Sequence, residues 1–482
     1  MLSGSGIARG GVYLVLRQVL GTGVSLLAMF FVTRTIGAGA FGSFAATLAI
    51  VGLVQTVCLF GIPVFLLRRT ETPERSEYDI AFTLSLLLAA VVTIGGLVAA
   101  TEFDRIPGIP GVGLLGASMF LATPLVFATA IPAAALERSL DFRRVASIEV
   151  AAQLANVSLS IPLALTGAGV WAPIAGWWAA ICVTAILTFV FGCYRPRLRW
   201  DARRAGHMLA FGLRFSASAW LFQLRQLFNP LLIGPFLGAE AVGVFALTTR
   251  VVEALSFAKG IAWRMSLAVF GQLGAADGRV SAAVAKGALL QLVMLLPLLL
   301  GFSIVGPQLV SHILGHDWGA TRSLFPPIAM GVLLNSLFTL QASALHVAGR
   351  SPMVALFSAT QVVCLMIGGC VAIPMLGLDG VVVAEIAAAA AYPILHRTMV
   401  VVYGPSRMNL AYVFGVAGAI ALFWQTLGGF AWIPLACVFV SPPFRRILRR
   451  ELPRLLSMPR KTMAEPPRTA AHPAQGSGVR RS

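Results

Sequence analysis

The chain has few charged residues, and this shortage excludes a water-soluble fold. Only 11% of its 482 residues are Asp, Glu, Lys or Arg, whereas 58% are hydrophobic. A soluble globular protein carries about 25% charged residues. Apolar runs of about 20 residues, each long enough to cross the hydrocarbon of a bilayer, recur along the sequence. They predict an all-α polytopic membrane protein, because lipid offers no hydrogen-bond partners to unpaired backbone groups.

Cysteine is also scarce, and its spacing indicates neither a disulfide framework nor a zinc site. The six cysteines fall in or beside apolar runs, and no two of them form a CxxC pair. His312, His316 and Asp317 have the spacing of metal ligands, but no further ligand follows nearby, so a solvated loop is favoured. We therefore expect no bound metal.

Nucleotide-binding patterns are missing or coincidental. No phosphate-binding loop with its lysine occurs in the chain. The run GAGAFG at residues 37–42 matches GxGxxG, yet no strand precedes it and no acidic residue follows about 20 positions later. The sequence predicts no cofactor and no enzyme activity, so ion gradients, the membrane potential or a concentration difference would have to drive any transport.

A net charge of +18 can indicate a nucleic-acid-binding protein, but here membrane topology explains the basic residues. They concentrate in alternate short loops and in the tail after Ser441, whereas the other loops hold only Arg34, Arg105 and Arg322. Cytoplasmic loops of membrane proteins carry such an excess. We expect a multi-pass protein of the bacterial inner membrane, with both termini in the cytoplasm and no nucleic-acid partner.

The apolar runs predict about fourteen transmembrane helices. Their expected bounds are 11–33, 41–66, 80–100, 111–135, 146–165, 170–192, 207–231, 239–260, 287–305, 324–346, 353–375, 380–402, 411–427 and 431–440. We divide the chain into an N-terminal lobe (1–205), a C-terminal lobe (206–405), a terminal hairpin (406–443) and a basic, partly disordered cytoplasmic tail (444–482).

An internal repeat supports two equivalent lobes. The run IGAGAFGSFAATLAIV at 36–51 aligns without gaps to LGAEAVGVFALTTRVV at 237–252, and eight of sixteen positions are identical. The two copies lie six predicted helices apart and therefore share one orientation in the membrane. A parallel repeat about an axis along the membrane normal is expected.

Several segments, in their order and spacing, resemble the polysaccharide transporter family of lipid-linked oligosaccharide flippases. These flippases belong to the multidrug/oligosaccharidyl-lipid/polysaccharide exporter superfamily. The segments are IGAGAFGSFA, GIPVFLLRR, LERSLDFRRVASIEV, LALTGAGVWAPIAG, YRPRLRW, FGLRFSAS, LGAEAVGVFALTTRVVE and LGHDWGATRSLFPPIAMG.

The resemblance implies a fold and a cargo. The fold would have twelve or fourteen helices, with a central cavity between two lobes lined largely by helices one, two, seven and eight. The cargo would be an undecaprenyl-pyrophosphate-linked repeat unit for exopolysaccharide, capsule or O-antigen synthesis. Partners would be this lipid-linked oligosaccharide, membrane lipids, and a polysaccharide polymerase with its co-polymerase.

Basic residues inside the predicted spans are the candidates for binding an anionic cargo. A charge deep in a span costs at least about 2.5–3.5 kcal/mol on insertion scales and normally faces a cavity or a partner. Arginine offers bidentate donors to phosphate oxygens. We assign Arg17, Arg225 and Arg250 to pyrophosphate binding. A secondary set that could equally be interfacial anchors is Arg214, Lys259 and Arg264.

Buried carboxylates are few, and they allow two interpretations. Protonation of Glu253 or Glu385 could couple transport to a proton gradient. Alternatively, either carboxylate could form a static ion pair, and Glu253 stands three residues after Arg250, where the two side chains could neutralise each other. Glu149 is expected to be an interfacial partner of nearby arginines.

The function favoured is alternating access, in which the cargo's head group enters a cationic cavity while its lipid tail stays in the bilayer. One rival is a drug exporter of the same superfamily, although cationic drugs need buried acids, and arginines outnumber carboxylates in these spans. A second is a membrane polymerase or ligase, although no predicted outer loop exceeds about 20 residues. A non-transporting scaffold would leave the arginines inside the spans unexplained.

Overall fold

The structure is a computed structural model that describes residues 23, 25–68, 73–105, 107–139, 141–192, 194–257, 259, 266, 278–315, 318–405, 408–442 and 444–445. Every regular element in this part of the chain is helical, which confirms the predicted all-α class. A helix at Ser25–Ile36 precedes α2. The helices of the first half are α2 (Ala38–Cys58), α3 (Ile62–Arg68), α4 (Arg75–Phe103), α5 (Val112–Phe120), α6 (Thr123–Arg138), α7 (Phe142–Leu165) and α8 (Trp171–Phe191).

The second half begins with α9 and ends with a short helix near residue 440. Its elements are α9 (Ala202–Leu224), η1 (Arg225–Leu227), η2 (Asn229–Ile233), α10 (Gly234–Leu255), α12 (Gly278–Leu314), α13 (Thr321–Val347), α14 (Ser351–Leu376), η4 (Gly377–Asp379), α15 (Gly380–Ala389), α16 (Tyr392–Tyr403), α17 (Asn409–Leu422), α18 (Trp424–Leu427), η5 (Gly428–Trp432) and α19 (Ile433–Val440).

The helices are long and apolar enough for a multi-pass membrane protein, but the predicted number of fourteen is not confirmed. Among the described residues, eight helices could cross a membrane, or ten if each of two bent pairs counts as one span. One of the eight, Ser351–Tyr403, turns back on itself at Gly377, whose φ is +61°. Beyond this turn Gly380 packs against the backbone of Ala372. The two expected spans at 353–375 and 380–402 therefore form a hairpin.

The single span predicted at 41–66 is wrong, because the chain breaks between α2 and α3. Phe60 adopts a left-handed conformation with φ +49°, and Gly61 follows with φ +59°. Left-handed backbone interrupts a helix, and the next helix starts at once with Pro63 in its first turn, where the missing N–H is tolerated. The carbonyl of Phe60 faces Gly212 of α9, where a Cβ would come within 1.9 Å of the oxygen.

Several other predicted spans are also interrupted, among them those at 111–135 and 207–231. The span at 111–135 consists of α5 and α6, which are bent by 43° about Leu121 and Ala122. The span at 207–231 ends as an α-helix at Leu224 and continues through the 3-10 turn η1 and the π-helical turn η2. Such departures from α geometry frequently mark functional sites, and Arg225 begins this one.

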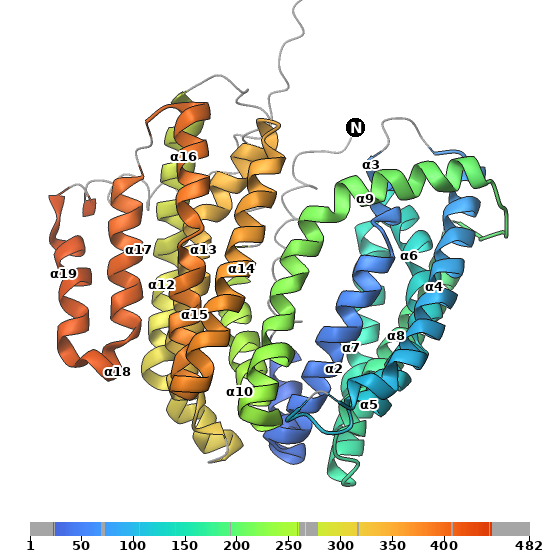
Figure 1. Cartoon of the computed structure of the whole chain (residues 1–482), viewed down its shortest axis with the longest axis horizontal. Coiled ribbons are helices and arrows are strands. Elements are labelled where there is room, and N and C mark those ends of the chain that lie inside the picture. Colours follow the sequence, from blue (N-terminus) through green and yellow to red (C-terminus); the bar gives the residue numbers. More distant parts are fainter. Residues whose placement is uncertain are drawn as a thin grey trace, which may run out of the picture.

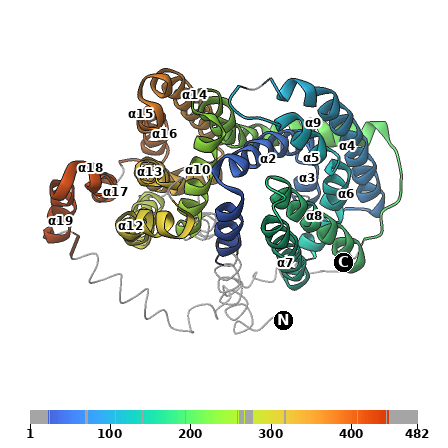
Figure 2. The ribbon, with the colours of Figure 1, turned by 90° about the horizontal axis from the view of Figure 1, so that it is seen from below.

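The helices form two groups that meet along α2 and α10 (Figure 1). Helices α2 to α8 gather on one side and α12 to α19 on the other, while α9 runs across one end of the first group and then descends between the groups. In the view along the bundle, α2 and α10 lie side by side at the centre (Figure 2). The largest hydrophobic core joins α2 to the helices of the second group, including Phe41 and Ile50.

The two copies of the repeat adopt the same local conformation. Gly37 has φ 83° and ψ 166°, and its counterpart Gly238 has φ 84° and ψ 176°. A Cβ on Gly42 would lie 1.8 Å from the carbonyl oxygen of Ala239, and one on its counterpart Gly243 would lie 2.1 Å from that of Ala38. The contact is reciprocal, as a local two-fold axis requires. Small residues four apart thus let the backbones of α2 and α10 touch.

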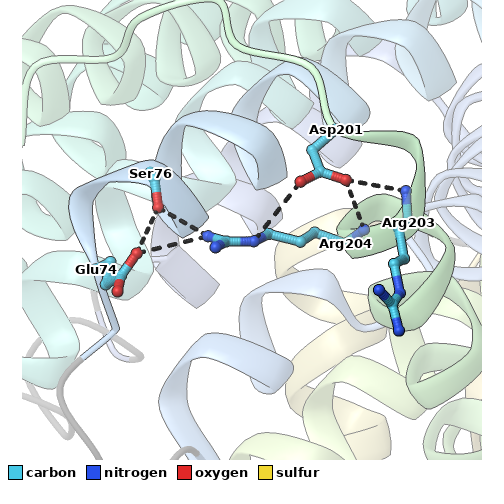
Figure 3. A network of polar contacts seen from close by, with 5 residues as sticks. All are labelled: Glu74, Ser76, Asp201, Arg203 and Arg204. Atoms are coloured by element: carbon cyan, nitrogen blue, oxygen red, sulfur yellow. Dashed lines mark hydrogen bonds and ion pairs between the residues drawn. The ribbon is translucent and has the colours of Figure 1, made fainter.

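A polar network joins the start of α9 to the start of α4 (Figure 3). Asp201 caps α9 by accepting hydrogen bonds from the backbone N–H groups of Arg203 and Arg204 at 3.0 and 3.1 Å. The Arg204 guanidinium donates to the Ser76 hydroxyl at 3.0 Å, and this hydroxyl donates to Glu74 at 2.9 Å. The bond from Ser76 and the charge of Arg204 lower the pKa of Glu74. The network joins the two segments outside the apolar spans.

Replacing Asp201 with alanine is expected to lower the stability of the protein modestly. The substitution removes the side-chain acceptor from the α9 N-terminus, which costs about 0.5–2 kcal/mol in other proteins. Thermal unfolding of the purified protein in detergent measures the effect. Asp201→Asn keeps a capping oxygen and should unfold close to the wild type, so equal losses in both variants would show that the ion pair with Arg204 matters more than the cap.

A second contact secures the extended segment between α8 and α9. The Tyr194 hydroxyl donates to the Asp79 carboxylate at 2.5 Å, and the backbone N–H of Arg197 donates to the same oxygen at 3.1 Å. Burial raises the pKa of the Tyr194 phenol, and the bond to Asp79 raises it further. The phenol therefore stays protonated as a donor, and the arginine-rich segment is held against α4.

Candidate functional site

A cavity of about 440 Å³ lies between the two groups of helices. This volume is typical of a small-molecule site. The first group lines it with the helix Ser25–Ile36, α2, α7 and Pro173 of α8, and the second with the end of α9, η1 and α10. The lining residues include Phe41 and Phe44 of α2, close to the point where α2 and α10 touch.

The two walls of the cavity differ in charge. The charged lining residues are Arg225, Arg250 and Glu253, and all three belong to the second group. The wall made by α7 carries the neutral side chains of Gln153, Asn156 and Ser160. Among the described lining residues, positive charge is therefore confined to one side.

Arg250 faces the cavity from α10 in a pair with Glu253. Its Nη1 lies 3.3 Å from Glu253 Oε2, and the side chains are 61% and 45% exposed. The Arg250–Glu253 pair, which was one of the two alternatives offered by the sequence, is therefore present. Exposed pairs of this kind are worth little. Arg250 retains donors that can turn to a ligand, since a guanidinium has five N–H groups and this pair uses one.

Arg225 is held more firmly, by a carboxylate from the second group. Its Nη2 donates to Glu385 Oε1 of α15 at 2.6 Å, and the two side chains are 31% and 7% exposed. Glu385 packs against Gly331 of α13, where an added Cβ would lie 2.5 Å from Glu385 Oε2. Arg225 still reaches the cavity lining, so it combines a structural bond with an accessible edge.

Further polar groups extend from this pair into the second group. Lys259 Nζ donates to Asn335 Oδ1 of α13, and Gln361 Nε2 donates to the Tyr392 hydroxyl at 3.2 Å. Buried polar groups in a membrane span normally pair in this way. Lys259 thus has a protein partner and does not line the cavity, whereas the sequence placed it among possible cavity residues.

The other predicted site residues are placed only in part. Arg17 and Arg264 lie outside the described residues. Arg214 lies in α9, and its side chain is not among those described. Arg225, Arg250 and Glu253 line one cavity, and Glu385 contacts Arg225.

Sequence reasoning missed the polar face of α7. Gln153, Asn156 and Ser160 recur at intervals of three and four, which places them on one face of a helix. This periodicity inside an apolar span was the available signal. Attention to charge alone overlooked it, because neutral amides insert into membranes at lower cost than arginine does.

The described residues hold no group of three or more His, Cys, Asp or Glu that could bind a metal ion. The five cysteines placed by the structure, Cys58, Cys182, Cys364, Cys370 and Cys437, are free thiols. His316 and Asp317 of the predicted metal-like spacing lie outside the described residues, and His312 lies in α12.

Comparisons with known proteins give a consistent family and fold. Residues 31–323 match the model of a family described as "Polysaccharide biosynthesis protein". The chain is 24% identical over 340 residues to the lipopolysaccharide biosynthesis protein WzxC of Escherichia coli (strain K12), covering 68% of this chain and 67% of WzxC. It is 21% identical over 303 residues to the succinoglycan biosynthesis transport protein ExoT of Rhizobium meliloti (strain 1021), covering 61% and 60%.

Solved structures share the fold at low sequence identity. The lipid II flippase MurJ in an inward closed conformation superposes with a TM-score of 0.70 at 11% identity, covering 92% of this chain and 99% of MurJ. An inward-facing multidrug resistance MATE family transporter of the MOP superfamily gives 0.63 at 16% identity, covering 79% and 95%. Together the matches confirm the family resemblance, and the descriptions of ExoT and MurJ refer to a transport protein and to a flippase.

Proposed function

Because the chain belongs to the polysaccharide biosynthesis protein family, with a family match from residue 31 to 323, we propose that it moves a lipid-linked oligosaccharide across the bacterial inner membrane. The observation that carries this proposal is the cavity between the helix groups, with Arg225 and Arg250 in its wall. The names of WzxC and ExoT, which refer to lipopolysaccharide and to succinoglycan transport, support the same class of cargo.

The cargo we propose is an undecaprenyl-pyrophosphate-linked repeat unit. Its pyrophosphate would be bound by Arg250 and by the accessible edge of Arg225, with Arg17 as a third cation. Fixed guanidinium groups replace the water that a phosphate loses on entering a low-dielectric passage. The lipid tail would stay in the bilayer while the head group occupies the cavity.

Alternating access is the proposed mechanism, with residues 1–205 and 206–405 as the moving lobes. The glycine contact between α2 and α10 supports it, because the backbones touch through Gly42 and Gly243 beside the lining residues Phe41 and Phe44, where they would close one end of the cavity. With both termini in the cytoplasm this closed end would face outward. Movement of the lobes would separate α2 from α10 and release the head group on that side.

Ion coupling and protein partners complete the proposal. Protonation of Glu385 would weaken its bond to Arg225 and free the guanidinium for phosphate, and Glu253 could act on Arg250 in the same way. A polysaccharide polymerase and its co-polymerase would receive the translocated unit.

Arg250→Ala is the direct test. In proteoliposomes that contain only this protein, we expect the variant to lose at least about tenfold in the rate of translocating a lipid-pyrophosphate-linked oligosaccharide, because a charged hydrogen bond to phosphate contributes about 1.5–3 kcal/mol. Protein abundance should stay normal, since the Arg250–Glu253 pair is exposed.

Arg105→Ala is the matched control. Arg105 also pairs with a carboxylate three residues away, Glu102, but it is 77% exposed and outside the cavity. Unchanged translocation in Arg250→Ala would remove this residue from the mechanism. Export of a cationic dye by a wild-type protein that leaves the lipid-linked sugar in place would favour the drug-exporter alternative, for which Glu253 in the lining is the relevant acid.

A further inference from the structure

The α7 wall of the cavity has polar side chains without the charge that a phosphate site needs. Gln153, Asn156 and Ser160 line the cavity from this helix. Apolar residues of α7 outside the lining, Val150, Leu154 and Leu159, are between 40% and 57% exposed. Gln153, Asn156 and Ser160 recur at intervals of three and four and therefore share the cavity face of α7.

The two amides have unused hydrogen-bonding capacity. In the part of the chain that the structure describes, the side chains of Gln153 and Asn156 make no hydrogen bond. Gln223 beside the cavity donates to Thr56 at 3.4 Å, and Gln361 donates to Tyr392, whereas the buried amide of Gln291 in α12 also has no partner among the described residues. Each carboxamide offers two donors and an acceptor oxygen. Polar groups at this depth need a partner, and the cavity is where one can enter.

The backbone of α7 holds this wall in place. A Cβ on Gly176 of α8 would lie 2.7 Å from the carbonyl oxygen of Asn156 and 2.8 Å from the Cβ of Ser160. Helices α7 and α8 therefore pack backbone to backbone at the height of the polar residues. A binding group carried by two tightly packed helices is more precisely oriented than one on a loop.

We propose that Gln153 and Asn156, with Ser160 behind them, form a saccharide subsite that faces the phosphate subsite across the cavity. This inference rests on the proposed function and assigns the sugar of the cargo to α7. Sugar hydroxyls both donate and accept hydrogen bonds, as carboxamides do, so neutral amides match a neutral saccharide while Arg250 matches the phosphate. A cavity of about 440 Å³ admits the sugars nearest the pyrophosphate and not a long glycan.

The test compares two lipids that differ only in the sugar. The probes are undecaprenyl pyrophosphate and undecaprenyl pyrophosphate bearing a single hexose, and their affinities are measured by titration into wild-type protein in nanodiscs. The variant is Gln153→Met/Asn156→Leu, which keeps side-chain size, removes the amides and makes α7 more apolar, so that membrane insertion is not impaired. Ser158→Leu is the control, because Ser158 lies on α7 but its exposed hydroxyl bonds to the Ala155 carbonyl.

We expect the wild type and Ser158→Leu to bind the hexose-bearing lipid more tightly than the bare one. The double variant should lose this preference, about tenfold in affinity for two or more neutral hydrogen bonds, and should bind the bare lipid as the wild type does. Equal preference in the double variant and the wild type, or no preference in the wild type, would overturn the saccharide subsite. Failure of the wild type to bind either lipid would instead overturn the proposed function.

Discussion

Gly42→Ala is expected to abolish most translocation and to lower the thermal stability of the protein. The added Cβ would lie 1.8 Å from the carbonyl oxygen of Ala239 and 2.8 Å from the backbone nitrogen of Gly243. Neither atom belongs to a flexible side chain, so α2 and α10 must separate to accept the methyl group. Overpacking of this kind costs about 1–3 kcal/mol. The cost falls on the conformation in which the two helices touch.

Two matched variants make this result interpretable. Gly39→Ala adds the same methyl group one turn earlier in α2, where nothing lies within 4 Å, and should unfold and transport like the wild type. Gly243→Ala meets the carbonyl of Ala38 at 2.1 Å and should reproduce the Gly42 effect. The measurements are thermal unfolding and the translocation rate per folded protein. If Gly42→Ala loses stability but translocates normally, the contact between α2 and α10 serves folding and takes no part in the transport cycle.

Because Gly42 and Gly243 lie in the same contact between α2 and α10, the stability losses of the two substitutions should not be additive. Once one methyl group has separated α2 from α10, the second meets less resistance, and neighbouring sites commonly couple by about 0.5–3 kcal/mol. The double variant Gly42→Ala/Gly243→Ala is therefore expected to unfold close to either single variant. Additive losses would show that the two contacts are independent and would contradict the reciprocal arrangement.

Much of the fold was predictable, because a bilayer imposes one length and one polarity on every span. The runs at 80–100, 146–165 and 170–192 correspond to α4, α7 and α8 within a few residues. The glycines at which α2 and α10 meet belong to the internal repeat, although the repeat by itself predicted only two lobes of the same orientation. Composition could not reveal the breaks at Phe60 and Arg225, because an interrupted helix is as apolar as a continuous one.

Charge made Arg225 and Arg250 candidates from the sequence, but the sequence did not indicate the ion pair between Arg225 and Glu385. A charged side chain inside a membrane span is costly and normally faces a cavity or a partner, which makes both arginines candidates. The partner of Arg225 is Glu385, 160 residues later in the chain, and no periodicity joins such distant positions. The carboxylate that the sequence offered for ion coupling is thus the same group that fixes a proposed phosphate ligand.

Because Glu385 both pairs with Arg225 and is the candidate for ion coupling, Arg225→Met is the second substitution with a large expected effect. Removal of the guanidinium leaves Glu385, which is 7% exposed, as an unpaired carboxylate inside a membrane protein. Breaking a buried pair costs about 3–5 kcal/mol, so the variant should accumulate poorly and unfold at a lower temperature. Glu385→Gln should behave better, because a neutral amide can still accept a hydrogen bond from Arg225.

The double variant Arg225→Met/Glu385→Leu separates stability from transport. A buried ion pair can be replaced by apolar residues of similar volume at little cost, so abundance and thermal stability should recover toward the wild type. Translocation should not recover, because the cavity then keeps Arg250 but lacks the second described cation of its lining. Wild-type translocation by this double variant would show that the pair is structural only. Of the two arginines in the described lining, Arg250 would then keep its proposed role in binding phosphate and Arg225 would not.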